Sequence, residues 1–233
     1  MKFIIGNWKM NGTLNEKESM FNTLKNIQTT NKIIMCLPFT LLYGDNYGVT
    51  IGAQDTSAHP NGAYTGDISA QMIKNTGAEY VLVGHSERRS YHNETNEIVK
   101  SKATAAMANG LTPIICVGET ASEHDASQTM DVVKQMVLES VPDNGEYIIA
   151  YEPRWAIGAS VTPTEKEITD VHETIYETLK GIGMENTPII YGGNVNIENV
   201  SNIINLPHVD GVLIGRASLK TETFLPIIKS VEQ

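Results

Sequence analysis

Short apolar runs alternate with longer amphipathic stretches along the whole chain, and this alternation limits the possible folds more than any other feature. The runs are rich in Ile, Val and Tyr, and there are eight of them: KFII, IIMCL, VTIGAQ, YVLVGH, TPIICVG, YIIAYE, TPIIYGG and GVLIGR. Each is continuously apolar, which is typical of strands that are buried on both faces of a parallel sheet covered by helices.

Helical patterns separate most of these runs. Apolar residues recur at three- and four-residue spacing in the stretches 16–27, 68–76, 94–108, 122–138, 164–179, 197–204 and 217–231. The connection after Cys36 is short, and its helical pattern is weak. Eight such units in a chain of 233 residues favour a closed (β/α)8 barrel over an open doubly wound sheet. No low-complexity linker divides the chain, so we predict an α/β fold with a single barrel domain over residues 1–233.

Composition narrows the classes of partner. The net charge is −10, whereas binding to nucleic acid or to an anionic membrane needs a basic face. No apolar run approaches the roughly 20 residues that span a bilayer, and MKFIIGNWKMNG turns polar too early for a signal peptide. Cys36 and Cys116 lie in apolar runs without metal-ligand spacing, which suits reduced thiols. We therefore expect a cytoplasmic protein with no metal site and with neither nucleic acid nor membrane as a partner.

Polar residues and glycines gather where the predicted strands end. In a (β/α)8 barrel, function lies at the carboxyl ends of the strands and in the loops that follow them. The residues found there are Asn7, Lys9, His85, Glu87, Glu119, Glu152, Gly192, Gly193 and Gly215. Taken singly, a lysine of this kind is a solvated charge, a histidine packs in a core, a glutamate pairs with an arginine, and glycines serve turns. Their concentration at one end of the barrel instead indicates an active site.

The residues around these positions form long and unusual strings. GNWKMNG, GAQDTS, GAYTGDIS, VGHSERR, ICVGE, AYEPRWAIG, YGGNV and DGVLIGRASL follow one another from residue 6 to residue 219. In these motifs the sequence closely resembles the triosephosphate isomerase family, over essentially the whole chain. The resemblance implies a TIM barrel of glycolysis and gluconeogenesis that interconverts dihydroxyacetone phosphate and D-glyceraldehyde 3-phosphate through an enediolate, without metal or organic cofactor.

The same resemblance implies roles for individual residues. Glu152 matches the base that moves a proton between neighbouring carbons, and His85 matches the electrophile that stabilises charge on the carbonyl oxygens. Lys9 and Asn7 match further donors. The family is itself a standard example of a neutral histidine electrophile at a helix N-terminus, and SERR after His85 would begin that helix.

Phosphate binding is implied at glycine-rich turns, where backbone N–H groups are accessible. The match places these donors at Gly158, Asn194, Gly215 and Arg216, and residues 153–161 resemble a lid that closes over the phosphate. The substrate is thus expected to be a small phosphorylated triose.

Four residues depart from the family pattern. Arg154 replaces an aliphatic residue at a lid hinge, and we expect its guanidinium to face solvent rather than an acidic partner. Ser160 and Asn194 replace residues that meet when the lid shuts, and Arg216 replaces a residue that is small in many relatives.

The loop from Asn61 to Ser69 matches the segment through which the family dimerises, so we predict a homodimer in which Thr65 reaches towards the partner's Asn7 and the partner's Lys9. Two other functions stay open from the sequence. One is a Schiff-base aldolase that uses Lys9, and the other is a barrel that binds a phosphorylated ligand or another protein without catalysis.

Overall fold

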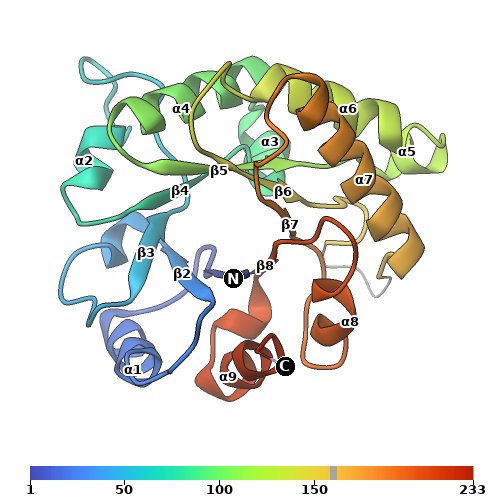
Figure 1. Ribbon diagram of the computed structural model, residues 1–233. Coiled ribbons are helices and arrows are strands. Elements are labelled where there is room, and N and C mark those ends of the chain that lie inside the picture. The colour runs from blue at the N-terminus through green and yellow to red at the C-terminus, as the bar shows by residue number, and fades with distance from the viewer. Residues whose placement is uncertain (158–161, 233) are drawn as a thin grey trace.

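The computed structural model describes residues 1–157 and 162–232. In this part of the chain, eight parallel strands close into a barrel in the order β1 to β8, and Figure 1 shows the helices arranged around it. The predicted (β/α)8 barrel is therefore confirmed.

Each strand falls on one of the predicted apolar runs. The strands are β1 (Phe3–Asn7), β2 (Lys32–Leu37), β3 (Thr50–Ala53), β4 (Tyr80–Val83), β5 (Thr112–Val117), β6 (Ile148–Tyr151), β7 (Ile189–Tyr191) and β8 (Gly211–Ile214). The barrel closes where β1 pairs with β8 and Phe3 lies opposite Gly211. A Cβ atom at Gly211 would lie 2.3 Å from the carbonyl oxygen of Phe3, so this closure requires glycine.

The helices follow the strands with two departures from the sequence pattern. They are α1 (Leu14–Leu24), α2 (Ala70–Lys74), α3 (Ser86–His92), α4 (Asn96–Ala108), α5 (Ala121–Asp125), α6 (Thr129–Ser140), α7 (Glu165–Gly181), α8 (Val200–Ile204) and α9 (Thr221–Ser230), with the 3-10 helices η1 (Phe39–Leu41) and η2 (Arg216–Ser218). The stretch 122–138 is divided between α5 and α6 because Ser127 adopts a φ of 58°, which a right-handed helix excludes. After β2, only the single turn η1 forms before β3. Within the described ranges, no helix is long and apolar enough to cross a membrane.

Side chains on both faces of the strands are buried. One cluster fills the barrel interior and includes Ile5, Leu82 and Ile190, whereas a larger one packs between the strands and the helices. Cys36 and Cys116 belong to the interior cluster, and burial raises the pKa of both thiols. These cysteines therefore pack the core as uncharged side chains.

A buried network of four charges joins the segment after β3 to α3 and α4. Lys102 Nζ lies 2.7 Å from Asp55 Oδ1 and also contacts Glu94 Oε1. Arg88 Nε lies 2.6 Å from Glu94 Oε1, and its Nη2 atom lies 2.8 Å from Asp55 Oδ2. The side chains of Lys102 and Glu94 are 9% and 4% exposed, so each charge depends on its partners for stabilisation.

We predict that Lys102→Met lowers the free energy of unfolding by about 3–5 kcal/mol, because it leaves the buried Glu94 and the partly buried Asp55 with one remaining cation. The matched control is Lys100→Met on the same helix. Lys100 pairs with Asp143 at the surface, and its loss is expected to change stability by about 1 kcal/mol or less. Urea unfolding at one fixed protein concentration measures both. Equal effects of the two substitutions would contradict the importance of the buried network.

Candidate active site

Glu152 follows β6 directly and is buried at the carboxyl end of the barrel. Its Oε1 atom lies 2.9 Å from His85 Nε2, and its Oε2 atom accepts a hydrogen bond of 2.9 Å from the backbone N–H of Ser86. Burial raises the pKa of the Glu152 carboxyl, but the interactions with His85, Ser86 and Lys9 outweigh that effect, so the pKa lies below its ordinary value. Glu152 is therefore a carboxylate at neutral pH and has the charge that a general base needs.

His85 is the N-cap residue of α3. Its Nδ1 atom accepts a hydrogen bond of 3.2 Å from the backbone N–H of Glu87. Since Nδ1 is the acceptor, the proton of the neutral ring lies on Nε2, which faces Glu152. The fold thus places an N–H donor opposite a carboxylate, and this pair can serve as electrophile and base on one small molecule.

Lys9 supplies a positive charge beside this pair. It has a φ of 52°, and its backbone N–H donates to Asn7 Oδ1 over 3.0 Å, which ties the turn after β1 to the end of the strand. The ammonium group lies 2.6 Å from Glu87 Oε1. A Cβ atom at Gly215 would lie 3.6 Å from Lys9 Cε, so the lysine side chain lies close to the loop after β8.

Two glycines from neighbouring strands pack against Glu152. A Cβ atom at Gly118 would lie 1.8 Å from the carbonyl oxygen of Glu152, and one at Gly192 would lie 2.9 Å from its Cγ atom. From the sequence, Gly192 is one of the residues gathered at the strand ends, whereas Gly118 has no predicted role. In the sequence, each glycine is marked only by its position directly after a strand. Its close approach to Glu152, which follows the strand between them, is visible only in the structure.

Three of the four residues predicted to bind phosphate, Asn194, Gly215 and Arg216, lie on the neighbouring loops after β7 and β8, two strands that pair with each other. Asn194 is exposed, and its carbonyl oxygen accepts a hydrogen bond of 2.8 Å from Asn199 Nδ2. Arg216 is exposed at the start of η2, directly after Gly215. Gly158 and Ser160 lie outside the described residues, so their predicted roles stay predictions.

Glu119, at the end of β5, is fully buried and holds the segment that follows Glu152. Its Oε1 atom accepts hydrogen bonds from Trp155 Nε1 (2.7 Å) and from the hydroxyl of Tyr151 (3.2 Å). Its carbonyl oxygen accepts from the backbone N–H of Arg154 over 3.1 Å. Glu119 thus positions the chain on both sides of the base. Among the described residues, no hydrogen bond joins Glu119 to the Glu152 carboxylate.

The sequence placed the Arg154 guanidinium in solvent, and in the structure it lies at the surface, where it also has a hydrogen-bond partner. Its Nη2 atom donates a hydrogen bond of 2.7 Å to the hydroxyl of Ser90 on α3. The hydrogen-bond partner is a neutral hydroxyl and not the acidic side chain that was the alternative. A hydroxyl 64 residues away gives no local signal in the sequence.

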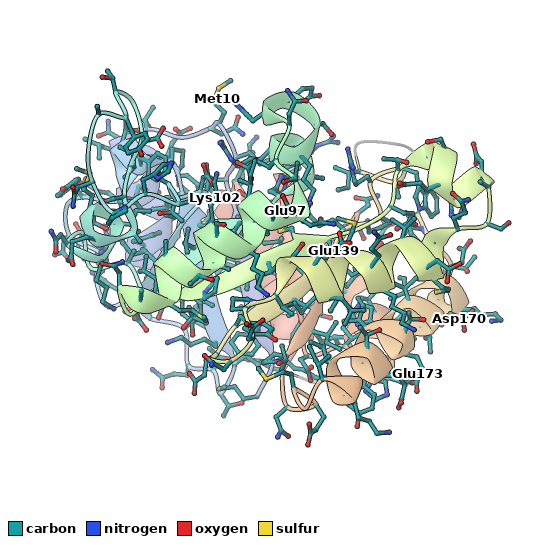
Figure 2. The ribbon with its side chains drawn as sticks, turned by 90° about the horizontal axis from the view of Figure 1, so that it is seen from above. Met10, Glu97, Lys102, Glu139, Asp170 and Glu173 are labelled. Carbon is teal, nitrogen blue, oxygen red and sulfur yellow. The ribbon has the colours of Figure 1, made fainter. Side chains whose placement is uncertain are left out.

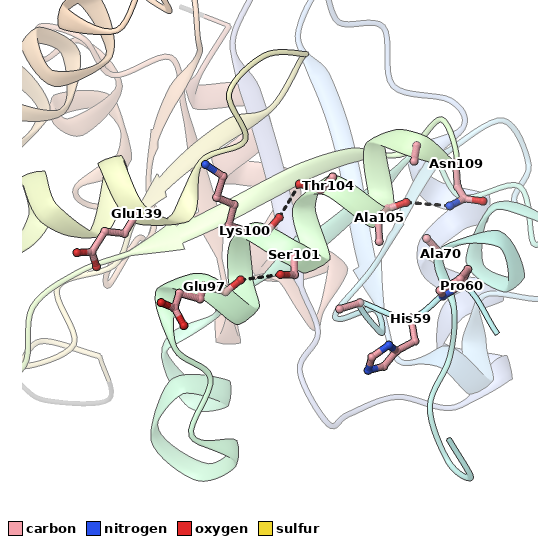
Figure 3. A pocket seen from close by; sticks show the side chains of 12 residues that line it. His59, Pro60, Ala70, Glu97, Lys100, Ser101, Thr104, Ala105, Asn109 and Glu139 are labelled. Atoms are coloured by element: carbon pink, nitrogen blue, oxygen red, sulfur yellow. Dashed lines mark hydrogen bonds between the residues drawn. The ribbon is translucent and has the colours of Figure 1, made fainter. Parts of the chain in front are cut away.

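A cavity of about 620 Å³ lies elsewhere, along the outer side of α4 (Figure 3). It is lined on one side by Ser101 and Thr104 of α4 and on the other by His59 and Pro60. The base and the electrophile do not line it, so this cavity is separate from the candidate active site. Within residues 1–157 and 162–232, no group of three or more His, Cys, Asp and Glu side chains is placed to hold a metal ion.

Comparisons with known proteins agree with the geometry. The family described as Triosephosphate isomerase matches residues 2–231. A triosephosphate isomerase of Hyphomonas neptunium is 40% identical over 99% of this chain and 98% of that protein, and one of Wolbachia sp. subsp. Brugia malayi is 42% identical over 99% of this chain and 97% of that protein. The crystal structure of triosephosphate isomerase from Bartonella henselae superposes with a TM-score of 0.89 at 36% identity, covering 100% of this chain and 99% of that one. With matches of this extent, the chain belongs to the triosephosphate isomerase family.

Proposed function

We propose that the chain interconverts dihydroxyacetone phosphate and D-glyceraldehyde 3-phosphate, with Glu152 as the base and His85 as the electrophile. The observation that carries the assignment of these roles is the 2.9 Å contact between Glu152 Oε1 and His85 Nε2 at the carboxyl end of the barrel. Membership of the family identifies the reaction, and the geometry supports the assignment of Glu152 as the base and His85 as the electrophile.

The reaction moves one proton between two carbons and another between their oxygens. The Glu152 carboxylate takes the proton from C1 of the ketose, the C1–H electron pair forms the C1=C2 double bond, and the π electrons of the C2 carbonyl move to O2. The hydroxyl proton then passes from O1 to O2, the carbonyl re-forms at C1, and the same carboxyl returns the carbon-bound proton to C2. His85 Nε2–H donates to the oxygens on which negative charge develops, and the Lys9 ammonium stabilises that charge. Asn7 holds the turn that carries Lys9.

Substrate binding must separate the base from the electrophile. Glu152 Oε1 and His85 Nε2 are within hydrogen-bond distance of each other, and Glu152 Oε2 also accepts from Ser86 N–H. A triose that receives a hydrogen bond from His85 and gives a proton to Glu152 has to lie between the two groups. The carboxylate therefore leaves this arrangement when the substrate is held for reaction.

We assign the phosphate to the loops after β7 and β8. Supporting this, Gly215 lacks a side chain beside Lys9 Cε, and the backbone N–H groups of Asn194, Gly215 and Arg216 belong to two adjacent loops. Gly158 is expected to add a further N–H group. Local donors and one ammonium act at short range, whereas the net charge of −10 is spread over the molecule and screened.

We expect Glu152→Gln to lower kcat by about 10²–10⁴-fold, because an amide cannot accept the proton from carbon. Glu173→Gln, on the outer surface of α7 (Figure 2), is the matched control and should retain the parent rate. A coupled assay of glyceraldehyde 3-phosphate isomerisation measures both. Parent activity in Glu152→Gln would refute the role of the base.

The Schiff-base alternative makes a different prediction. An aldolase that used Lys9 would gain a stable secondary amine after borohydride treatment with dihydroxyacetone phosphate. We expect intact-mass measurement to show no such adduct on the parent. A covalent adduct at Lys9 would replace the isomerase assignment by the aldolase one.

We also propose that the protein is a cytoplasmic homodimer of one barrel domain spanning residues 1–233. Strands from both ends of the chain close a single sheet, and both cysteines are buried and unpaired, as in proteins of a reducing compartment. For the dimer, the supporting feature is exposed apolar surface on the loops that the sequence match assigns to the interface. Met10, which projects from one edge of the molecule in Figure 2, is 96% exposed, and Tyr64 in the loop from Asn61 to Ser69 is 45% exposed.

We predict that sedimentation at micromolar concentration gives the mass of a dimer. Met10→Asp should shift the mass towards that of the monomer, because a buried carboxylate without a partner destabilises an interface. Ile182→Asp is the control, since Ile182 is an exposed apolar residue at the end of α7, away from these loops. A parent that sediments as a monomer would contradict the dimer.

A further inference from the structure

Arg154 and Ser90 form a contact that links the segment after the base to the helix of the electrophile. Arg154 lies two residues beyond Glu152, and its Nη2 atom donates to Ser90 Oγ over 2.7 Å. Ser90 lies on α3, whose N-cap is His85 and whose first residue is Ser86. Since His85 and Ser86 bind the Glu152 carboxylate, residues 152–154 are attached to the same helix at two points.

The side chain of Arg154 joins residues 153–155 to α3 through an exposed hydrogen bond, whereas other contacts of these residues lie on the side of β5. The backbone N–H of Arg154 and the indole of Trp155 both donate to Glu119, on the side of β5. The backbone of Glu152 itself is confined by Gly118 and by the hydrogen bond from its N–H to the carbonyl oxygen of Val117. Movement of the base away from His85 therefore has to be accommodated by its own side chain and by residues 153–155.

We propose that the Arg154–Ser90 hydrogen bond is a positioning contact that stabilises the paired arrangement, defined here as Glu152 bound to His85 and Ser86. This inference rests on the proposed function, in which the substrate must separate Glu152 from His85. A contact that favours the paired arrangement lowers the population of the arrangement that binds ligand, and so weakens the apparent affinity for ligand.

Two properties of Arg154 act in opposite directions. Its hydrogen bond opposes ligand binding, whereas its positive charge favours an anionic ligand in a protein whose net charge is −10. Ser90→Ala removes the hydrogen bond and keeps the charge, but Arg154→Ala removes both. The two substitutions therefore separate the contact from the charge.

The experiment measures the affinity for 2-phosphoglycolate, whose carboxylate resembles the enediolate, by calorimetry. We expect Ser90→Ala to lower Kd by about threefold to tenfold, which corresponds to the loss of one hydrogen bond from the paired arrangement. Arg154→Ala should lower Kd by less than Ser90→Ala does. The double variant should match Arg154→Ala, because no contact is left to remove.

Three comparisons guard against a general structural effect. Ser90→Thr retains the hydroxyl and should retain the parent Kd. Ser201→Ala removes another exposed hydrogen bond between two elements, the one between the hydroxyls of Ser201 on α8 and Ser230 on α9, and should also leave Kd unchanged. Urea unfolding of each variant establishes that it is folded; a loss of rigidity alone would raise Kd rather than lower it.

An unchanged or higher Kd in Ser90→Ala would overturn the inference, as would effects of Ser90→Ala and Arg154→Ala that simply add in the double variant. If the parent catalyses isomerisation and Ser90→Ala binds like the parent, this inference fails alone. If the folded parent neither turns over substrate nor binds 2-phosphoglycolate, the proposed function fails and this inference fails with it.

Discussion

The hydrogen bond between the Glu152 carboxylate and the His85 imidazole is the interaction on which the arrangement of the site depends. It brings together the end of β6 and the start of α3. Ser86, the first residue of α3, is 66 residues away from Glu152 in the sequence. It is possible because His85 uses Nδ1 to accept from the helix N-terminus, which directs the proton on Nε2 towards the carboxylate. The backbone therefore sets the chemical character of the ring before any ligand takes part.

The barrel provides the rigidity that this contact requires. Gly118 and Gly192 allow the neighbouring strands to approach Glu152 so closely that a Cβ atom at either position would overlap with it. Glu119, which is buried in the loop after β5, accepts hydrogen bonds from Tyr151 and Trp155, on either side of the base. The charged side chain at the end of this apolar strand is thus stabilised by the backbone N–H of Ser86 and by His85, not by solvent. This explains why a strand built for the core finishes in a carboxylate.

The fold and the gathering of polar residues at the strand ends could be predicted from the sequence because both depend on local patterns, whereas the roles of individual residues were implied by the family resemblance. The apolar runs predict the strands, and the carboxyl ends of the strands predict the face of the barrel where function lies. Only a few polar residues lie at those ends. Ser127 shows one limit: its left-handed conformation divides a stretch whose periodicity predicts one continuous helix. The contact of Lys102 with Asp55 shows another limit. A helical pattern does not distinguish a buried, paired lysine from a solvated one, because the partner is distant in the sequence. Arg154 and Ser90 belong to the same class of long-range pairs.

The departures from the family pattern fall outside the proposed base and electrophile. Glu152 and His85 match the family, as do the neighbouring Lys9 and Asn7, whereas Arg154 introduces a cation beside the base without touching its carboxylate. A change in a reacting group would alter the barrier to proton transfer directly. A change in a contact that fixes the neighbouring chain alters the balance between arrangements of the same reacting groups. Substitution at such positions can therefore adjust the affinity for ligand while the chemistry of the site is retained.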